Sequence, residues 1–299
     1  MKKLSIVLAV GILSLMTGCY YFGPCIDGTG PVITETREIS DFTAVTNTGS
    51  FDVIIRHSDE FLVEVEAQGN LMSFIETYVS GQTLIIKTSE GTCIRSSTPV
   101  KVHVSLPGLE ELESTGSGSI VADIARGEVV ECTNTGSGFL SLDSVVSEVL
   151  NVSNTGSGTV FINESTTDEI ELVQTGSGEL DAAVVYGCEE VNIKHSSSGR
   201  VRTEVVDGVL VTVVQSGSGN TEISGDAVEA DFALTSSGRL DALDLMTTDV
   251  KATNTGSGRI FVYATATLDA TITGSGDIIY RGNPSISYRI TGSGDVRPY

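Results

Sequence analysis

The sequence predicts an all-β fold: a single-stranded parallel β-helix, of the right-handed kind, with about ten T-G-S-G coils and an N-terminal β cap. The T-G-S-G element recurs along most of the chain at intervals of 18 to 21 residues, and apolar and polar residues alternate on both sides of each copy. Aromatic residues make up only 6% of the chain and Trp is absent. The core must therefore be built from small and β-branched side chains, which favour strands. Repetition at a fixed short period is typical of stacked structural units.

The N-terminus has the pattern of a secretory signal peptide. Two lysines precede an apolar run over residues 4–16, which is shorter than the roughly 20 residues that a helix needs to cross a bilayer. The stretch Met16-Thr17-Gly18-Cys19 resembles the bacterial lipobox, in which the signal is cleaved before the cysteine and the cysteine is acylated. We therefore expect a signal peptide at residues 1–18 and a lipid on Cys19. The alternative is an ordinary signal peptide followed by a chance cysteine.

The remainder of the chain divides by pattern. We expect a lipid-anchored tether at residues 19–30 and one folded domain at 31–299, in which 31–110 form the N-terminal cap part and 111–299 the repeat coils. The residue after Cys19 is not Asp, which by analogy with lipoproteins favours the outer membrane. The chain carries 17 Lys and Arg against 39 Asp and Glu, a net charge of −22. Such a surface repels nucleic acid, so no nucleic-acid partner is expected.

Four cysteines remain after Cys19, in an oxidising compartment. A disulfide between Cys25 and Cys93 is predicted, tying the tether to the first part of the fold. Cys132 occupies an inward position of the repeat and is expected to be a small core residue. Cys188 lies in a different phase about three coils away, too far for a bond to Cys132. No metal site is expected, because there is no C-x-x-C pair and the three histidines are scattered.

The recurring element predicts a tight corner in each coil. Seven copies read T-G-S-G and begin at Thr115, Thr135, Thr155, Thr175, Thr255, Thr273 and Thr291; three variants begin at Ser196, Ser216 and Thr235. We expect the closing glycines to be structural corner residues that take positive φ without steric cost, while the corner serines stack on their equivalents. These glycines are Gly118, Gly138, Gly158, Gly178, Gly258, Gly276 and Gly294, with Gly199, Gly219 and Gly238 in the variants.

The flanking residues predict two short strands per coil. Apolar side chains stand five and three residues before each corner, as with Leu150 and Val152, and again two residues after the closing glycine, as with Val160. Such alternation indicates strands. Only Thr221 interrupts the ladder after the corners. Coils about 4.8 Å apart would make a rod on the order of 45 Å long. Polar residues just before the corners are candidates for ladders that satisfy the turn backbone: Asn134, Asn154, Gln174, Gln215 and Asn254.

The order of motifs resembles a known family. Arg37-Glu38-Ile39-Ser40-Asp41-Phe42 is followed by Phe51-Asp52-Val53, by Val102-His103-Val104-Ser105-Leu106-Pro107-Gly108-Leu109 and by the T-G-S-G coils, which together resemble the autotransporter adhesin head GIN domain. The resemblance covers nearly all of the chain from about residue 31. It implies a β-helical, secreted, cell-surface domain. Nothing after the repeats has the pattern of a membrane β-barrel translocator, so we expect the lipid on Cys19 to do the anchoring.

The acids and serines of the repeats do not form a catalytic pattern. Acids of neighbouring coils do not fall in matching phase, and a pair such as Asp181 and Arg202 is expected to be a solvated salt bridge. We therefore predict no catalytic residue and no cofactor. We expect an adhesin or binding rod of the cell envelope that presents Ser- and Thr-rich faces to a surface glycan or another envelope protein. A polysaccharide-processing β-helix enzyme and a purely structural envelope protein are the alternatives.

The positions directly after the corners vary freely from one repeat to the next. Variation at a fixed register is expected of exposed residues that face a partner or water. These positions are Ser119, Phe139, Glu179, Arg200, Asn220, Arg239, Arg259 and Asp277.

Overall fold

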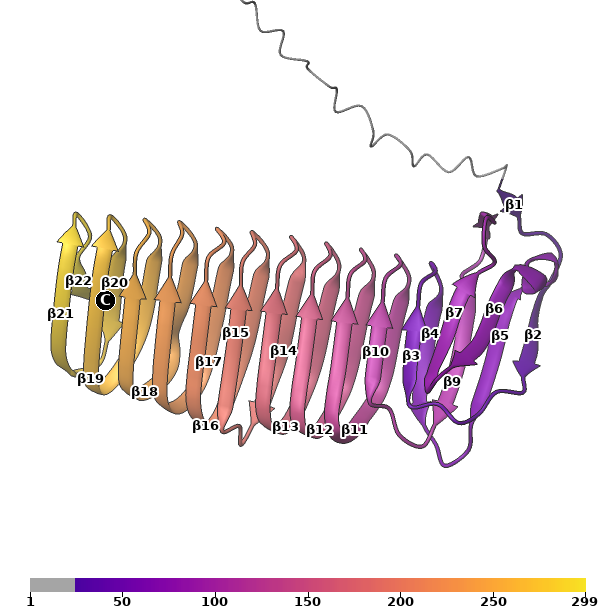
Figure 1. Ribbon diagram of the computed structural model, residues 1–299, viewed down its shortest axis with the longest axis horizontal. Coiled ribbons are helices and arrows are strands. Elements are labelled where there is room, and N and C mark those ends of the chain that lie inside the picture. Colours follow the sequence, from indigo (N-terminus) through magenta and orange to yellow (C-terminus); the bar gives the residue numbers. More distant parts are fainter. Residues whose placement is uncertain (1–24) are drawn as a thin grey trace, which may run out of the picture.

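The computed structural model describes residues 25–299, which form a rod of stacked coils closed at its N-terminal end by a cap (Figure 1). The predicted signal peptide and Cys19 lie outside the described residues. Strands account for most of the described chain, which contains no α-helix and one short 3-10 helix, η1 (Gly69–Phe74). The predicted all-β parallel stack is confirmed, with about nine complete turns. None of the described segments is a helix long and apolar enough to span a membrane.

Most coils run as one continuous strand from corner to corner. The strands are β10 (Glu111–Ser114), β11 (Ser119–Asn134), β12 (Phe139–Asn154), β13 (Thr159–Gln174), β14 (Glu179–Tyr186), β15 (Glu190–His195), β16 (Arg200–Gln215), β17 (Asn220–Leu234), β18 (Arg239–Asn254), β19 (Arg259–Gly274), β20 (Asp277–Arg281), β21 (Ser285–Gly292) and β22 (Val296–Pro298). Each pairs in parallel with its equivalent in the next coil, so that Ile120 lies beside Leu140 and Leu140 beside Val160. The pairing register is therefore the sequence repeat itself.

This register stacks like side chains into an apolar column. Ile120, Leu140 and Val160, two residues after successive closing glycines, are fully buried. Burying such a side chain stabilises the fold by roughly 1.5–3 kcal/mol. Cys132 lies in the column before the corners with no exposed surface, as predicted. Burial raises the pKa of its thiol to about 12, so the side chain stays protonated and packs as a small apolar group.

The closing glycines are required for a reason other than the predicted one. Within residues 25–299, none of the closing glycines has a positive φ. A Cβ built on Gly138 would instead lie 2.1 Å from the carbonyl oxygen of Gly118, and one on Gly158 would lie 2.0 Å from that of Gly138. Because that oxygen belongs to the backbone of the coil beneath, it cannot move aside. The prediction of positive φ is wrong: glycine closes each corner because consecutive coils approach too closely for a side chain.

The stack begins inside the segment predicted as the cap. Strands β3 (Ala44–Asn47) and β4 (Asp52–His57) pair in parallel with β10 and β11. They are joined by a corner that reads Thr48-Gly49-Ser50-Phe51, an eleventh copy with Phe in the closing position. Phe51 is buried. In the layer that pairs with this coil on its N-terminal side, a longer loop at residues 89–100 joins β7 to β9 in place of a tight corner, and Phe51 lies next to it. The start of the stacked coils therefore does not coincide with the boundary predicted after residue 110.

One more parallel layer and then antiparallel strands cover the N-terminal edge of this first coil. The remaining strands are β1 (Ile26–Asp27), β2 (Val32–Arg37), β5 (Leu62–Gln68), β6 (Ile75–Ser80), β7 (Thr83–Thr88), β8 (Ile94–Arg95) and β9 (Lys101–Leu106). Strands β7 and β9 continue the parallel layers below β3 and β4. Beyond them, β6 pairs antiparallel with β7, β5 with β9, and β2 with β5. This arrangement keeps the edge of the parallel stack from remaining open, as a cap must.

Candidate ligand-binding groove

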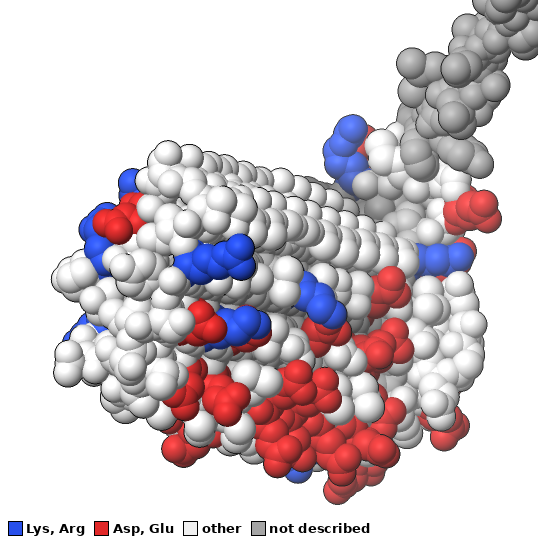
Figure 2. Space-filling view, turned by 60° about the vertical axis from the view of Figure 1, so that its left-hand side comes forward, with Lys and Arg blue, Asp and Glu red and all other residues white. Residues whose placement is uncertain are grey.

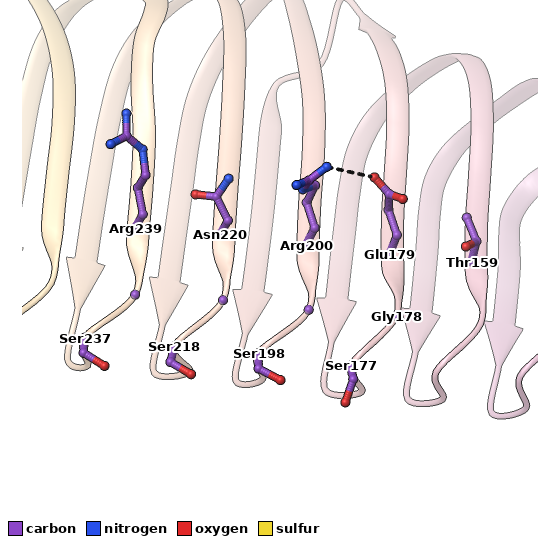
Figure 3. Close-up of a pocket in the computed structure, with 13 residues that line it drawn as sticks. Thr159, Ser177, Gly178, Glu179, Ser198, Arg200, Ser218, Asn220, Ser237 and Arg239 are labelled. Carbon is purple, nitrogen blue, oxygen red and sulfur yellow. Dashed lines mark ion pairs between the residues drawn. The ribbon is translucent and has the colours of Figure 1, made fainter.

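The residues directly after the closing glycines form a continuous row along the rod. Strand pairing places them side by side in consecutive coils: Ser119, Phe139, Thr159, Glu179, Arg200, Asn220, Arg239, Arg259 and Asp277, hereafter the post-corner row. A second row runs parallel to it at the corner loops and consists of Ser177, Ser198, Ser218, Ser237 and Ser257, hereafter the serine row. Figure 3 shows side chains of both rows projecting from successive coils.

A groove lies between the two rows because the residue that separates them is always glycine. Its main part has a volume of about 560 Å³ and extends over the coils from Thr159 to Arg239. A smaller hollow of about 300 Å³ continues it to Arg259. From Thr159 to Arg259 there are five coil steps, or about 24 Å. The glycines that allow close stacking thus also leave a trough parallel to the axis of the rod.

The groove is locally basic on an acidic molecule. Where it lines the groove, from Thr159 to Arg259, the post-corner row carries Arg200, Arg239 and Arg259 against one acid, Glu179, whereas the whole chain has a net charge of −22. The next residue of the row, Asp277, pairs with Arg297 at 3.4 Å. Figure 2 shows Asp and Glu gathered along the lower part of the rod, away from the uncharged corner ridge. Exposed acids midway between corners include Glu128, Glu148, Asp168 and Glu189.

The three arginines differ in how they are held. Arg200 Nη1 lies 3.8 Å from Glu179 Oε1, a long ion pair between half-exposed side chains. The guanidinium of Arg239 pairs with Asp241 and stacks 3.9 Å above the centre of the Phe261 ring. Across the described part of the chain, no carboxylate lies within 4 Å of the Arg259 guanidinium, although four neighbouring arginines have such partners. Arg200 and Arg259 are therefore the cations most available to a ligand.

A salt-bridge network flanks the groove two residues further along the strands. Arg202 bridges carboxylates of the coils on either side, with Asp181 at 3.1 Å and Glu222 at 3.4 Å. Partial burial raises the pKa of Asp181, and the Arg202 charge partly offsets that effect. The predicted salt bridge between Asp181 and Arg202 is confirmed. Because one guanidinium pairs with both carboxylates, this cluster links three consecutive coils through their side chains.

Buried polar side chains fix the corner loops from inside. Asn154 Nδ2 donates to the carbonyl oxygens of Gly158 at 3.1 Å and of Glu179 at 3.0 Å, and Gln215 Nε2 donates to that of Gly219 at 2.7 Å. The predicted satisfaction of turn backbone by this ladder is confirmed at these positions. His195 occupies the rung between the two glutamines of the ladder and was missed in the sequence because it differs in residue type. Its position one residue before a corner, which it shares with Gln174 and Gln215, could have identified it as a member of the ladder.

The predicted cysteine sites are placed as follows. Cys19 lies outside the described residues, so its acylation stays a prediction. Cys25 and Cys93 form a disulfide with their Cα atoms 4.5 Å apart, next to the short parallel pair of β1 and β8. Cys132 and Cys188 are buried free thiols. Within residues 25–299, no cluster of three or more His, Cys, Asp or Glu side chains has the arrangement of a metal site.

Comparison with known sequences identifies the family. The chain matches the family described as "Putative auto-transporter adhesin, head GIN domain" over residues 41–218 and 188–284. It belongs to this family. The matched ranges run from just before the first coil of this GIN domain to its last complete turn. Among proteins with curated functions, none matches the chain.

Solved structures show that the GIN fold recurs. A putative adhesin from Parabacteroides merdae is 22% identical, with 93% of this chain and 100% of that chain covered and a TM-score of 0.56. A putative adhesin from Parabacteroides distasonis is 21% identical, with 92% and 100% covered and a TM-score of 0.54. At these identities the likeness concerns the fold of this GIN domain.

Proposed function

We propose that this GIN-domain protein is a lipid-anchored adhesin of the bacterial cell envelope that binds a surface glycan along its post-corner groove. In this proposal Cys19 carries the lipid, residues 19–30 form the tether, and the rod stands out from the outer membrane. Membership of an adhesin family supports a role at the cell surface. The groove itself is the observation that carries the proposal, because it repeats one kind of binding position along the rod.

A repeated groove suits a repeated ligand. Each coil offers one post-corner side chain and one serine hydroxyl, at a spacing of about 4.8 Å. A single contact of this kind is weak in water. Several contacts along one polymer bind together with much higher effective affinity, since the first contact holds the remaining units near their sites. An extended polysaccharide therefore gains more from this surface than a compact ligand does.

The electrostatics favour binding over turnover. Glycoside hydrolysis needs two carboxyl groups that act as acid and as base or nucleophile. The carboxylates in and beside the groove are instead each paired with an arginine: Glu179 with Arg200, Asp181 and Glu222 with Arg202, and Asp241 with Arg239. These pairs engage each carboxylate with a guanidinium.

Binding is tested with the full chain, purified in detergent, on an array of polysaccharides and against envelope proteins in a pull-down. Retention of at least one polysaccharide without its degradation is the expected result. Release of shorter products would replace the adhesin by an enzyme, and capture of an envelope protein alone would replace the glycan as ligand.

Anchoring is tested separately by labelling growing cells with an alkyne-tagged palmitate. We expect the label on the wild-type chain and its loss in Cys19→Ala, with the variant released from the membrane fraction. Labelling that persists in Cys19→Ala would place the lipid elsewhere and remove the proposed anchor.

A further inference from the structure

We propose that the glycan taken by the groove is a polyanion, with carboxylate or sulfate groups that lie against Arg200 and Arg259. This inference rests on the proposed function and specifies its ligand. It begins from a contrast of charge: the post-corner row from Thr159 to Arg259 has three arginines and one glutamate, on a chain with 39 acids and 17 bases. Salt bridges within the protein account for only some of the arginines in this basic strip.

Internal salt bridges account for only part of this strip. Arg202, one row away, is held by carboxylates at 3.1 and 3.4 Å and has a structural task. Arg259 has no such partner among the described residues: Asp277 lies beside it in the row, but the carboxylate of Asp277 pairs with Arg297 at 3.4 Å. Arg200 reaches its only partner at 3.8 Å. Both side chains line the groove. They are therefore charged, exposed and largely uncompensated at the place where a ligand would lie.

The spacing of the cations fits a chain of anionic groups. Arg239 and Arg259 stand in adjacent coils, about 4.8 Å apart along the axis, and Arg200 stands two coils from Arg239. A linear polymer parallel to the rod would bring successive anionic groups past these positions. The planar guanidinium fork matches carboxylate and sulfate oxygens in pairs. Ser198, Ser218 and Ser237 on the opposite rim offer hydroxyls to the sugar ring.

The acidic part of the rod does not prevent a polyanion from binding in the groove. It lies midway between corners, about eight residues from the groove, which is roughly 26 Å when measured along the strand. The Debye length is about 8 Å at physiological ionic strength, so its repulsion is strongly screened at the groove. The same acids make the rest of the surface repel the polymer, which directs it to one strip.

The test measures binding of the full chain in detergent to polygalacturonate, alginate and chondroitin sulfate, and to neutral dextran and xylan. Methyl-esterified polygalacturonate is the matched probe, because esterification removes the charge and keeps the backbone. We expect the polyanions to bind, and esterification to raise the Kd at least about tenfold. Equal binding of the esterified polymer would overturn the inference. Binding of neutral polymers alone would also overturn it but leave the proposed function standing, whereas no polysaccharide binding at all would overturn both.

The residues are tested with the double variant Arg200→Ser and Arg259→Ser. Serine occupies the same row at Ser119, so the coil accepts it. The control is Arg126→Thr with Arg289→Thr, which removes the same charge at exposed positions outside the groove. We expect the groove variant to raise the Kd about tenfold and the control to change it less than about twofold, with both melting as the wild type does. Equal losses in the two variants would mean that net charge, and not the groove, carries binding.

Discussion

His195 and Thr221 form a buried pair across neighbouring coils, with His195 Nδ1 2.9 Å from Thr221 Oγ1. Thr221 is the one polar residue in the ladder of aliphatic side chains after the corners, and His195 is the one ring in the polar ladder before them. Both are buried. Thr221 therefore gives His195 Nδ1 a partner and takes one itself, because a polar atom placed alone in this core would be costly.

The pair can be tested by mutation. Thr221→Val restores the aliphatic ladder but leaves His195 Nδ1 without a partner, so we expect the free energy of unfolding to fall by roughly 1–3 kcal/mol. Adding His195→Gln should recover most of this loss, since Gln215 shows that glutamine at this register donates to the corner backbone. Urea denaturation of both variants measures the difference. A neutral Thr221→Val would mean that the contact contributes nothing.

The same histidine predicts a pH dependence of stability. Burial lowers the pKa of His195 below its ordinary value of 6.5. The unfolded chain then binds the proton more readily than the folded one, so this stabilisation is complete above about pH 6.5 and is lost as the pH falls from there through the folded pKa. We expect wild type to lose more stability than His195→Gln between about pH 7.5 and pH 5 in denaturation experiments. Parallel curves for the two proteins would contradict a buried neutral imidazole.

The closing glycines allow a test of the coil contacts. Gly158→Ala places a methyl group against the backbone oxygen of Gly138, so we expect a loss of about 1–3 kcal/mol or more in unfolding free energy. Gly108→Ala is the matched control, because nothing lies within 4 Å of a Cβ there and its φ is not positive. Thermal melts compare the two. Equal effects would show that coil proximity is not what selects glycine.

The disulfide predicts a local effect of reduction. It joins residues 68 positions apart, and the chain-entropy estimate for such a loop is about 4 kcal/mol. We expect reduction to increase hydrogen exchange in β1, β8 and the loop around Cys93, and to leave β12 to β19 unchanged. Peptide mass spectrometry of the unreduced protein should find Cys25 linked to Cys93. Two free thiols would contradict the assignment.

The repeat period determined how much of the fold was predictable. Register, inward columns and exposed post-corner positions all follow from a period near twenty, as Ile120, Leu140 and Val160 illustrate. The first coil was not predictable in this way, because Phe51 replaces the closing glycine and the cap strands separate β4 from β10. The groove was predictable only in part. The sequence places its arginines in the post-corner row, but the depth between the post-corner row and the serine row arises from coil packing. Which arginines form salt bridges depends on neighbours in three dimensions.

The register of the coils is tested most directly by distances along the post-corner row. Spin labels on cysteines introduced at Ser119 and, in separate proteins, at Arg200, Arg239 or Arg259 can be measured by pulsed electron resonance. The native thiols Cys132 and Cys188 should stay unlabelled, since burial raises their pKa values to about 12 and about 11. Four, six and seven coil steps predict distances of about 19, 29 and 34 Å. Distances that do not lengthen in this order, or a Ser119 to Arg259 separation below about 25 Å, would contradict the stacked rod and the groove built on it.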